Sequence, residues 1–385
     1  MTLVFVGHEA SLTGAPYTQL YLIQWLRVHT SHSIEVVLLR GGALVPEFEK
    51  VANVHILQEY TEMPSFGQRV IRKLEHLTDW RSKQIFKKLR ATQPALIFAN
   101  TTITLALAAQ LKRLLQVPLL INIHELETTF YYYNADEFRE NAKLVDFFIP
   151  GSQRVKQYYE KAFEVPVDKA RVVYDYTGDN IGGASTAAEV RRQLGIPAST
   201  RIVGAIGSLG WRKGPDLFLQ VAHQVAHQVA VLGHQDVKFV WVGGNRSSVP
   251  FKELQYDVQR MNLADKVAFV GNQSDLRGYY EAFDVLLLTS REDPFPLVCI
   301  EAGMMGCPTV CFAQAGGMPE FVRDDAGFVV PYADVQAMSE KTSYLLQNEL
   351  VRNSMGAQAR QRAETGHTIR SIGPQMYDII QQFLP

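Results

Sequence analysis

Cysteine is scarce in this sequence, and neither sign of charge is in excess. The 385 residues include three cysteines, and Lys plus Arg (38) nearly balance Asp plus Glu (39), for a net charge of -1. The spacing of Cys299, Cys307 and Cys311 fits neither a zinc ribbon nor a redox pair, so we expect buried, reduced thiols. A nucleic-acid-binding protein normally shows a basic excess, so we expect no nucleic acid partner.

The sequence also has no uninterrupted apolar run of membrane-spanning length. Residues 2–7 read as a strand, without the basic region and apolar segment of a signal peptide. Hydrophobic residues at 47% and charged residues at 20% are typical of a globular protein. We therefore expect a cytoplasmic protein, with membrane contact limited to the inner surface.

Apolar strand-like runs alternate with helix-length segments along the whole chain, which predicts an α/β protein with parallel sheets. The Gly- and Ser-rich stretch 175–189 interrupts this pattern and is interpreted as a linker. We expect two Rossmann-like, doubly wound domains facing across a cleft, residues 1–180 and 181–368, with a last helix at 369–385. The predicted strands are Leu3–Val6, Glu35–Leu39, Val54–Leu57, Leu96–Ala99, Leu119–Ile123, Asp146–Ile149, Arg201–Ile206, Lys238–Val242, Lys266–Val270, Val285–Leu288 and Thr309–Phe312.

The segment 289–301 says most about function. It follows the strand 285–288, which is apolar enough to be buried on both faces, and leads into a helix near Leu297. Pro296 suits the first helical turn, where no backbone N–H is needed. The amides of Leu297 and Val298 then point into the loop, and a helix N-terminus of this kind binds anions. Asp293 and Glu301 flank the site with carboxylates that accept hydrogen bonds from sugar hydroxyls.

This segment resembles the donor-binding signature of retaining glycosyltransferases of the GT-B fold, family 4. That signature is a Glu, seven intervening residues, a second Glu and an Ala, and Asp293 and Glu301 match it with the first acid shortened. Glu292 could also be the first acid of the signature, with eight intervening residues. We favour Asp293, because Phe295 then aligns with the apolar residues of the family signature. The resemblance implies that Asp293 contacts the donor sugar and Glu301 the nucleotide ribose, with Phe295, Leu297 and Val298 lining the site. The family's glycine is replaced here by Pro296.

A second loop carries positive charge. The predicted strand 201–206 ends in a Gly-rich turn that includes Arg212 and Lys213. The glycine spacing is wrong for a dinucleotide fingerprint, and no acid ends the next strand. Fixed cations can stabilise the charge of a departing nucleoside diphosphate. The family has a basic pair at this place; Lys213 matches its lysine closely, and Arg212 is assigned the second charge. A solvated basic turn is the structural alternative.

The first half contributes three further candidates. Gly14 and Ala15 lie in a strand-to-helix loop that approaches the donor diphosphate in similar enzymes. His124 ends the strand 119–123, where the family has a histidine near the donor sugar, and imidazole can polarise a hydroxyl or steady a charge. Residues 69–90 contain eight Lys or Arg but only two acidic residues, interspersed with apolar residues. This segment is either a helix that contacts anionic lipid or a solvated helix over the core.

Taken with the resemblance, these residues predict a hexosyltransferase that moves sugar from a UDP-, GDP- or ADP-sugar to an acceptor hydroxyl, which is a glycan, a lipid-linked molecule or a small molecule. We expect His124, Lys213 and Asp293 to act in catalysis and no tightly bound cofactor. The sequence contains no Asp-x-Asp, the divalent-metal motif of the other large glycosyltransferase fold, so no metal site is expected. A sugar-nucleotide epimerase and a catalytically silent nucleotide-sugar-binding protein remain as alternatives.

Overall fold

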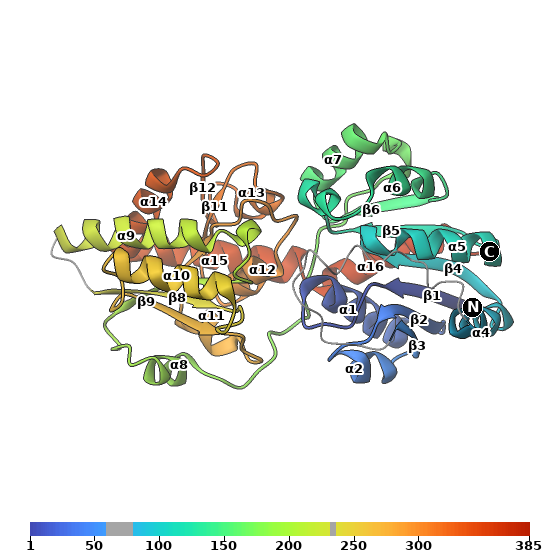
Figure 1. Ribbon diagram of the computed structural model, residues 1–385, viewed down its shortest axis with the longest axis horizontal. Helices are drawn as coiled ribbons and strands as arrows, with labels where there is room; N and C mark the ends of the chain where they lie inside the picture. Colours follow the sequence, from blue (N-terminus) through green and yellow to red (C-terminus); the bar gives the residue numbers. More distant parts are fainter. Residues whose placement is uncertain (59–79, 232–235) are drawn as a thin grey trace. The chain divides into compact units, whose positions relative to one another are not determined.

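The computed structural model describes residues 1–58, 80–231 and 236–385. The chain forms two compact units (Figure 1). Unit 1 comprises Met1–Gly178 and Thr368–Pro385, and unit 2 comprises Asp179–His367. Among the described helices, none combines the length and the apolar character needed to cross a bilayer.

Unit 1 is built on a parallel sheet of six strands in the order β3-β2-β1-β4-β5-β6, which is the order of a doubly wound fold. Side chains of β1 alternate between two separate apolar clusters: Val4 and Val6 enter one, and Leu3 and Phe5 enter the other. Both faces are therefore buried, which explains why the strands are apolar without a polar face. The strands are β1 (Thr2–Gly7), β2 (Ser33–Arg40), β3 (Asn53–Gln58), β4 (Pro94–Asn100), β5 (Leu119–Ile123) and β6 (Phe147–Pro150).

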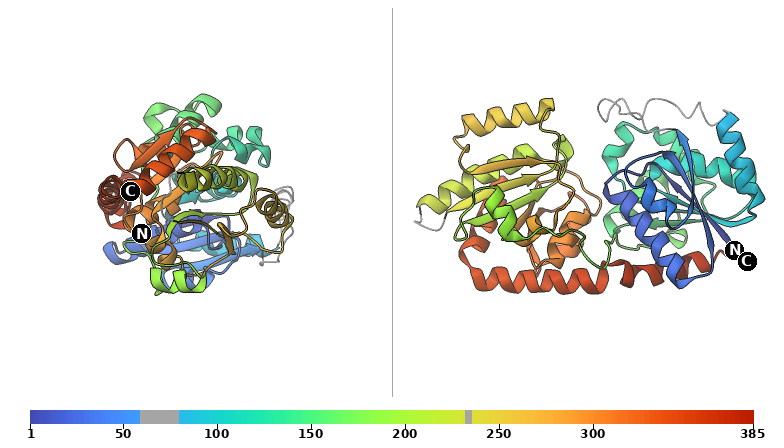
Figure 2. Two further views of the ribbon diagram at one scale, coloured as in Figure 1. Left: turned by 90° about the vertical axis from the view of Figure 1, so that its left-hand side faces the viewer. Right: turned by 90° about the horizontal axis from the view of Figure 1, so that it is seen from below.

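Helices cover this sheet, and the last one returns from the far end of the chain to pack beside α1 (Figure 2). The contact is close because Gly373 has no side chain: a Cβ there would lie 2.6 Å from the Trp25 ring. The described helices of unit 1 are α1 (Gly14–His29), α2 (Val45–Glu49), α4 (Trp80–Ala91), α5 (Leu105–Leu115), α6 (Ala135–Ala142), α7 (Gln153–Phe163) and α16 (Ile369–Gln381).

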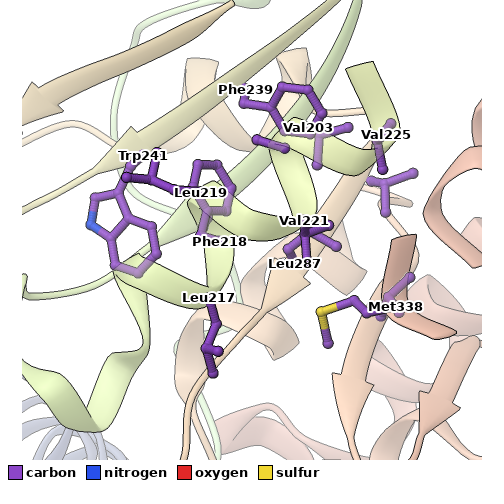
Figure 3. Close-up of a cluster of buried hydrophobic side chains, with 14 of the residues drawn as sticks. Val203, Leu217, Phe218, Leu219, Val221, Val225, Phe239, Trp241, Leu287 and Met338 are labelled. Carbon is purple, nitrogen blue, oxygen red and sulfur yellow. The ribbon is translucent and has the colours of Figure 1, made fainter. Parts of the chain in front are cut away.

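Unit 2 repeats the architecture with a parallel sheet in the order β12-β11-β10-β7-β8-β9. Its core is formed largely by α9 against the sheet, where Phe218 packs on Phe239 and edge-on against Trp241 at 5.3 Å (Figure 3). The strands are β7 (Arg201–Ile206), β8 (Val237–Val242), β9 (Val267–Gly271), β10 (Val285–Leu288), β11 (Thr309–Phe312) and β12 (Gly327–Val330). The helices are α8 (Ala187–Gln193), α9 (Pro215–Val231), α10 (Val249–Arg260), α11 (Arg277–Ala282), α12 (Leu297–Met304), α13 (Met318–Val322), α14 (Val335–Gln347) and α15 (Glu349–Gly366).

The predicted α/β fold with two doubly wound parallel sheets is confirmed, and all eleven predicted strands are present with shifts of one or two residues at most ends. One strand, β12, was not predicted. The predicted start of the linker at Asp175 was wrong, because unit 1 continues to Gly178 and Asp175 is buried within it. The three cysteines are free and buried, as expected.

Candidate functional site

The β7–α9 loop places two cations at the carboxyl edge of the unit 2 sheet. After β7 the chain forms a short 3-10 turn, Trp211–Lys213, that ends at Gly214 with φ +66. A Cβ on Gly214 would lie 2.1 Å from the carbonyl oxygen of Thr289, so this loop presses against the end of β10. Only glycine tolerates both the left-handed backbone and this close approach. The sequence thereby fixes Arg212 and Lys213 beside the β10–α12 loop.

The β10–α12 loop is held in turn by the loop that follows β11. The Asp293 amide donates to the carbonyl of Ala315 at 2.6 Å, and the Gly317 amide donates to the carbonyl of Pro294 at 2.8 Å. Gly316 has φ +151, and a Cβ there would lie 1.6 Å from the Asp293 carbonyl oxygen. The backbone of Asp293 is therefore clamped by a neighbour that must be glycine.

Asp293 forms the centre of an ion cluster with the two cations. Lys213 Nζ lies 2.5 Å from one carboxylate oxygen, and Arg212 Nη1 lies 3.5 Å from the other. The Ser290 hydroxyl donates to the first oxygen at 3.1 Å. Burial alone would raise the pKa of Asp293, but the charges of Lys213 and Arg212 and the hydrogen bonds lower it below its ordinary value. Asp293 is thus ionised at neutral pH although its side chain is only 7% exposed.

Arg291 joins the two loops from the outer side. Its amide donates to the Arg212 carbonyl at 2.7 Å, and Nη1 donates to the Trp211 carbonyl at 2.8 Å. Its guanidinium also makes two hydrogen bonds to the Asp216 carboxylate, at 2.9 and 2.6 Å, and lies over the Trp211 ring. Bidentate pairing of this kind restricts geometry as well as adding energy. The positions of Arg212 and Lys213 are therefore set by several contacts.

Glu301 lies one turn inside α12, where the buried Tyr280 hydroxyl donates to its Oε2 at 2.5 Å. Burial, followed by the Glu301 charge, raises the pKa of Tyr280 well above its ordinary value, so the hydroxyl stays a donor. Leu297 and Val298 begin α12 and are half-buried. Phe295 is buried and stacks on His367, with ring centroids 5.2 Å apart.

The candidates of the first half gather at the carboxyl edge of the unit 1 sheet. Gly14 and Ala15 form the start of α1, and the Ala15 carbonyl accepts a hydrogen bond from the Asn100 amide at 2.8 Å. His124 follows β5, with Nε2 2.9 Å from Asn100 Oδ1 and Nδ1 2.8 Å from Asp175 Oδ1. The structure thus brings the predicted residues together in two groups, one within each unit.

Several residues that contact these groups were not predicted from the sequence, among them Asn100, Asp175, Tyr280, Ser290 and Arg291. Asp175 follows an apolar pair, Val172 and Val173, which is the one local signal that the chain there is still part of a packed unit. In the described part of the chain, no group of three or more His, Cys, Asp or Glu side chains is arranged to hold a metal ion.

Two family models match this chain. Residues 186–362 match "Glycosyl transferases group 1", and residues 18–175 match "Glycosyltransferase Family 4". A D-inositol 3-phosphate glycosyltransferase from Corynebacterium diphtheriae is 29% identical over 186 residues, covering 47% of this chain and 43% of that protein. The match thus spans less than half the length of this relative. An uncharacterized glycosyltransferase from Methanocaldococcus jannaschii is 21% identical over 319 residues, covering 79% of this chain and 78% of its own.

Among solved structures, Anabaena HepE in complex with UDP and glucose has a TM-score of 0.81 to this chain at 21% identity, with 99% of each chain covered. The likeness extends over both sheets and shows the same fold. Together with the two family models, which account for residues 18–175 and 186–362, it identifies the chain as a member of the GT-B glycosyltransferases of family 4.

Proposed function

We propose that this protein transfers a hexose from a nucleotide diphosphate sugar to an acceptor hydroxyl, with retention at the anomeric carbon and without a metal ion. The observation that supports this most is the ion cluster of Asp293 with Lys213 and Arg212 at the carboxyl edge of the unit 2 sheet. Ligands of doubly wound sheets bind at this edge. HepE, which shares the fold, has been crystallised with UDP and glucose.

In the proposed reaction, Lys213 and Arg212 hold the diphosphate. Both cations are paired with Asp293 in the structure. Donor phosphate takes over the cations and leaves the Asp293 carboxylate to accept hydrogen bonds from the sugar hydroxyls. Charge on the departing nucleoside diphosphate is then stabilised by cations already fixed in place, as a metal ion would do elsewhere.

The remaining candidates have supporting roles in this proposal. Glu301 binds the ribose, Phe295 lines the apolar side, and the amides of Leu297 and Val298 at the start of α12 face the donor. Gly14 and Ala15 are proposed to bind the donor diphosphate through their backbone amides. The acceptor proton passes to the leaving phosphate on the same face of the sugar, so no side chain acts as a nucleophile.

A panel of UDP-, GDP- and ADP-sugars tests the proposal, first by thermal stabilisation and then by slow hydrolysis and transfer with EDTA present. We expect one nucleotide class to stabilise the wild type, and Lys213→Ala and Glu301→Ala to lose most of that effect. Lys143→Ala, which removes an exposed ion pair with Glu140 in unit 1, is the control. Proton NMR of the product gives the anomeric configuration.

Several outcomes would contradict this function. Conversion of the donor sugar without any acceptor would favour the epimerase, and binding without turnover in any condition would favour a silent binding protein. An inverted product or complete loss of activity in EDTA would refute retention or metal independence.

Membrane contact through residues 69–90 remains a prediction, and residues 59–79 lie outside the described part. In α4, Ile85, Phe86 and Leu89 are buried in the core while Lys87 and Lys88 are exposed. The apolar side of the described half of this segment is thus already used in packing. Co-sedimentation with anionic and neutral vesicles would test the contact, because a basic surface binds only the anionic ones.

A further inference from the structure

His124 has a polar partner at each ring nitrogen. Nδ1 lies 2.8 Å from a carboxylate oxygen of Asp175, and Nε2 lies 2.9 Å from Oδ1 of Asn100. The side chains of His124 and Asp175 are only 8% and 6% exposed, and Asn100 is 1% exposed. Water therefore has little access to either nitrogen.

The contacts at the two ring nitrogens point to one arrangement of protons. The Asn100 amide nitrogen donates to the Ala15 carbonyl at 2.8 Å, and a carbonyl can only accept. The amide is thereby fixed with its oxygen toward His124, so Nε2 must carry a proton. Nδ1 lies 2.8 Å from a carboxylate oxygen of Asp175, and this charge contact favours a proton on Nδ1 as well. An imidazole with a proton on both nitrogens is the imidazolium cation.

We propose that Asp175 and Asn100 are positioning residues that hold His124 as a fixed imidazolium, which serves the transfer reaction by its charge and not by moving a proton. This deepens the proposed function and rests on it. The cation lies beside the first turn of α1, because Asn100 bonds both the His124 ring and the Ala15 carbonyl. A fixed positive charge at the carboxyl edge of this sheet can stabilise negative charge that develops during the transfer reaction.

The charges around His124 agree with this assignment. Burial alone would lower its pKa, but Asp175 and, more weakly, Glu125 outweigh burial and raise it. Glu125 accepts from the His124 amide at 3.1 Å and from Thr102, and so is itself held in place. His8, from the loop after β1, is the other titratable group that acts on His124; burial lowers its pKa, which leaves it neutral and unable to repel the cation.

Two backbone features support the arrangement. A Cβ on Gly151 would lie 2.7 Å from an Asp175 carboxylate oxygen, so the glycine leaves room for this carboxylate. Thr101, between Asn100 and Thr102, has φ 86, a value that is strained for a β-branched residue. Strain of this kind persists only where the surroundings enforce it, often at functional sites.

The test is nitrogen NMR of the full chain labelled with ¹⁵N-histidine, with His124 assigned by loss of its signals in His124→Gln. In the wild type at pH 7 to 8, we expect both ring nitrogens at imidazolium shifts. Asp175→Asn, and independently Gly151→Ala, should lower the pH at which His124 becomes neutral by about 1–3 units, the usual effect of one neighbouring charge. The basic limb of the kcat/KM profile should move by the same amount.

Asp378→Asn is the matched control, because this residue forms an exposed ion pair with Arg171 in unit 1, and it should move neither curve. A neutral His124 in the wild type at pH 7 would overturn the inference, even if a variant failed to fold. An unmoved titration in a folded Asp175→Asn would overturn it too, and so would a pH profile that stays in place while the NMR titration shifts. If no donor supports transfer while the imidazolium is observed, the proposed function fails and the protonation assignment stands, so the two failures are distinguishable.

Discussion

Tyr280→Phe removes a single oxygen atom from the contact that positions Glu301. The Tyr280 side chain is 1% exposed, and its hydroxyl lies 2.5 Å from Glu301 Oε2. Phenylalanine keeps the ring and its packing, so the substitution tests the hydrogen bond alone. The same change at Tyr256, which is 65% exposed on α10, is the control.

The size of the effect follows from the burial of the two partners. A hydrogen bond to a charged group contributes about 1.5–3 kcal/mol, but Glu301 is half-buried and water can replace part of it. We expect the free energy of unfolding to fall by about 1–2 kcal/mol, and the Tm of a unit of this size to fall by roughly 2–8 °C. Ordering a released Glu301 on binding costs about 0.5–1.5 kcal/mol, which weakens nucleotide binding by about 2- to 10-fold.

Calorimetric titration separates this effect from a general loss of binding. If Glu301 binds the ribose, Tyr280→Phe should weaken binding of the complete nucleotide. It should weaken binding of the 2′- or the 3′-deoxy analogue less, depending on which hydroxyl Glu301 contacts. In Glu301→Ala the Tyr280→Phe change should then have no further effect on that difference. If Tyr280→Phe weakens binding of the nucleotide and of both deoxy analogues equally, Tyr280 does not position Glu301 to bind the ribose.

Three further predictions concern Asp293 and its neighbours. Lys213→Met leaves a buried carboxylate with Arg212 as its remaining cation, and should lower the free energy of unfolding at pH 7 by about 3 kcal/mol in urea melts. The pKa of Asp293 is lower in the folded protein than in the unfolded chain, so the ion pair of Lys213 with Asp293 should stabilise the fold fully above about pH 4. This stabilisation should disappear as the pH falls through the folded-state pKa of Asp293. Urea melts of the wild type and Lys213→Met between pH 2.5 and 6 should therefore give converging free energies of unfolding at the acid end. Gly316→Ala should displace the Asp293 backbone and weaken nucleotide binding more than tenfold by titration, whereas Gly182→Ala, where no atom lies within 4 Å of the new Cβ, should bind normally.

The fold could be predicted from the sequence where the strands are buried on both faces. Such strands are short apolar runs bounded by helices, and among the strands that the structure describes this pattern predicted all but β12. β12 is an edge strand that begins at a glycine and has a half-buried centre, so its apolar run is only Phe328, Val329 and Val330. Asp175 was assigned to the linker because glycines follow it, and only the packing of unit 1 shows that it is buried.

The site was accessible from sequence only in part. Local pattern predicts that the loops after β7 and β10 leave one edge of a sheet, because both strands are parallel. That Lys213 contacts Asp293, 80 residues away, depends on β7 and β10 being neighbours, which alternation of strands and helices does not specify. The Tyr280 contact with Glu301 has no local signal, since Tyr280 lies in the six-residue α11.

This chain departs from the family signature at Asp293 and Pro296, and both residues lie in the loop before α12. Asp293 is one methylene shorter than the usual Glu, and its backbone is clamped by Ala315 and Gly316, so a longer side chain would push the carboxylate past Lys213. Inserting a methylene into so buried a position costs about 1–3 kcal/mol. Pro296 lacks an amide hydrogen and stands at the N-cap of α12, directly before Leu297 and Val298. The first change therefore keeps the carboxylate charge of the site, and the second removes one backbone donor just before the helix.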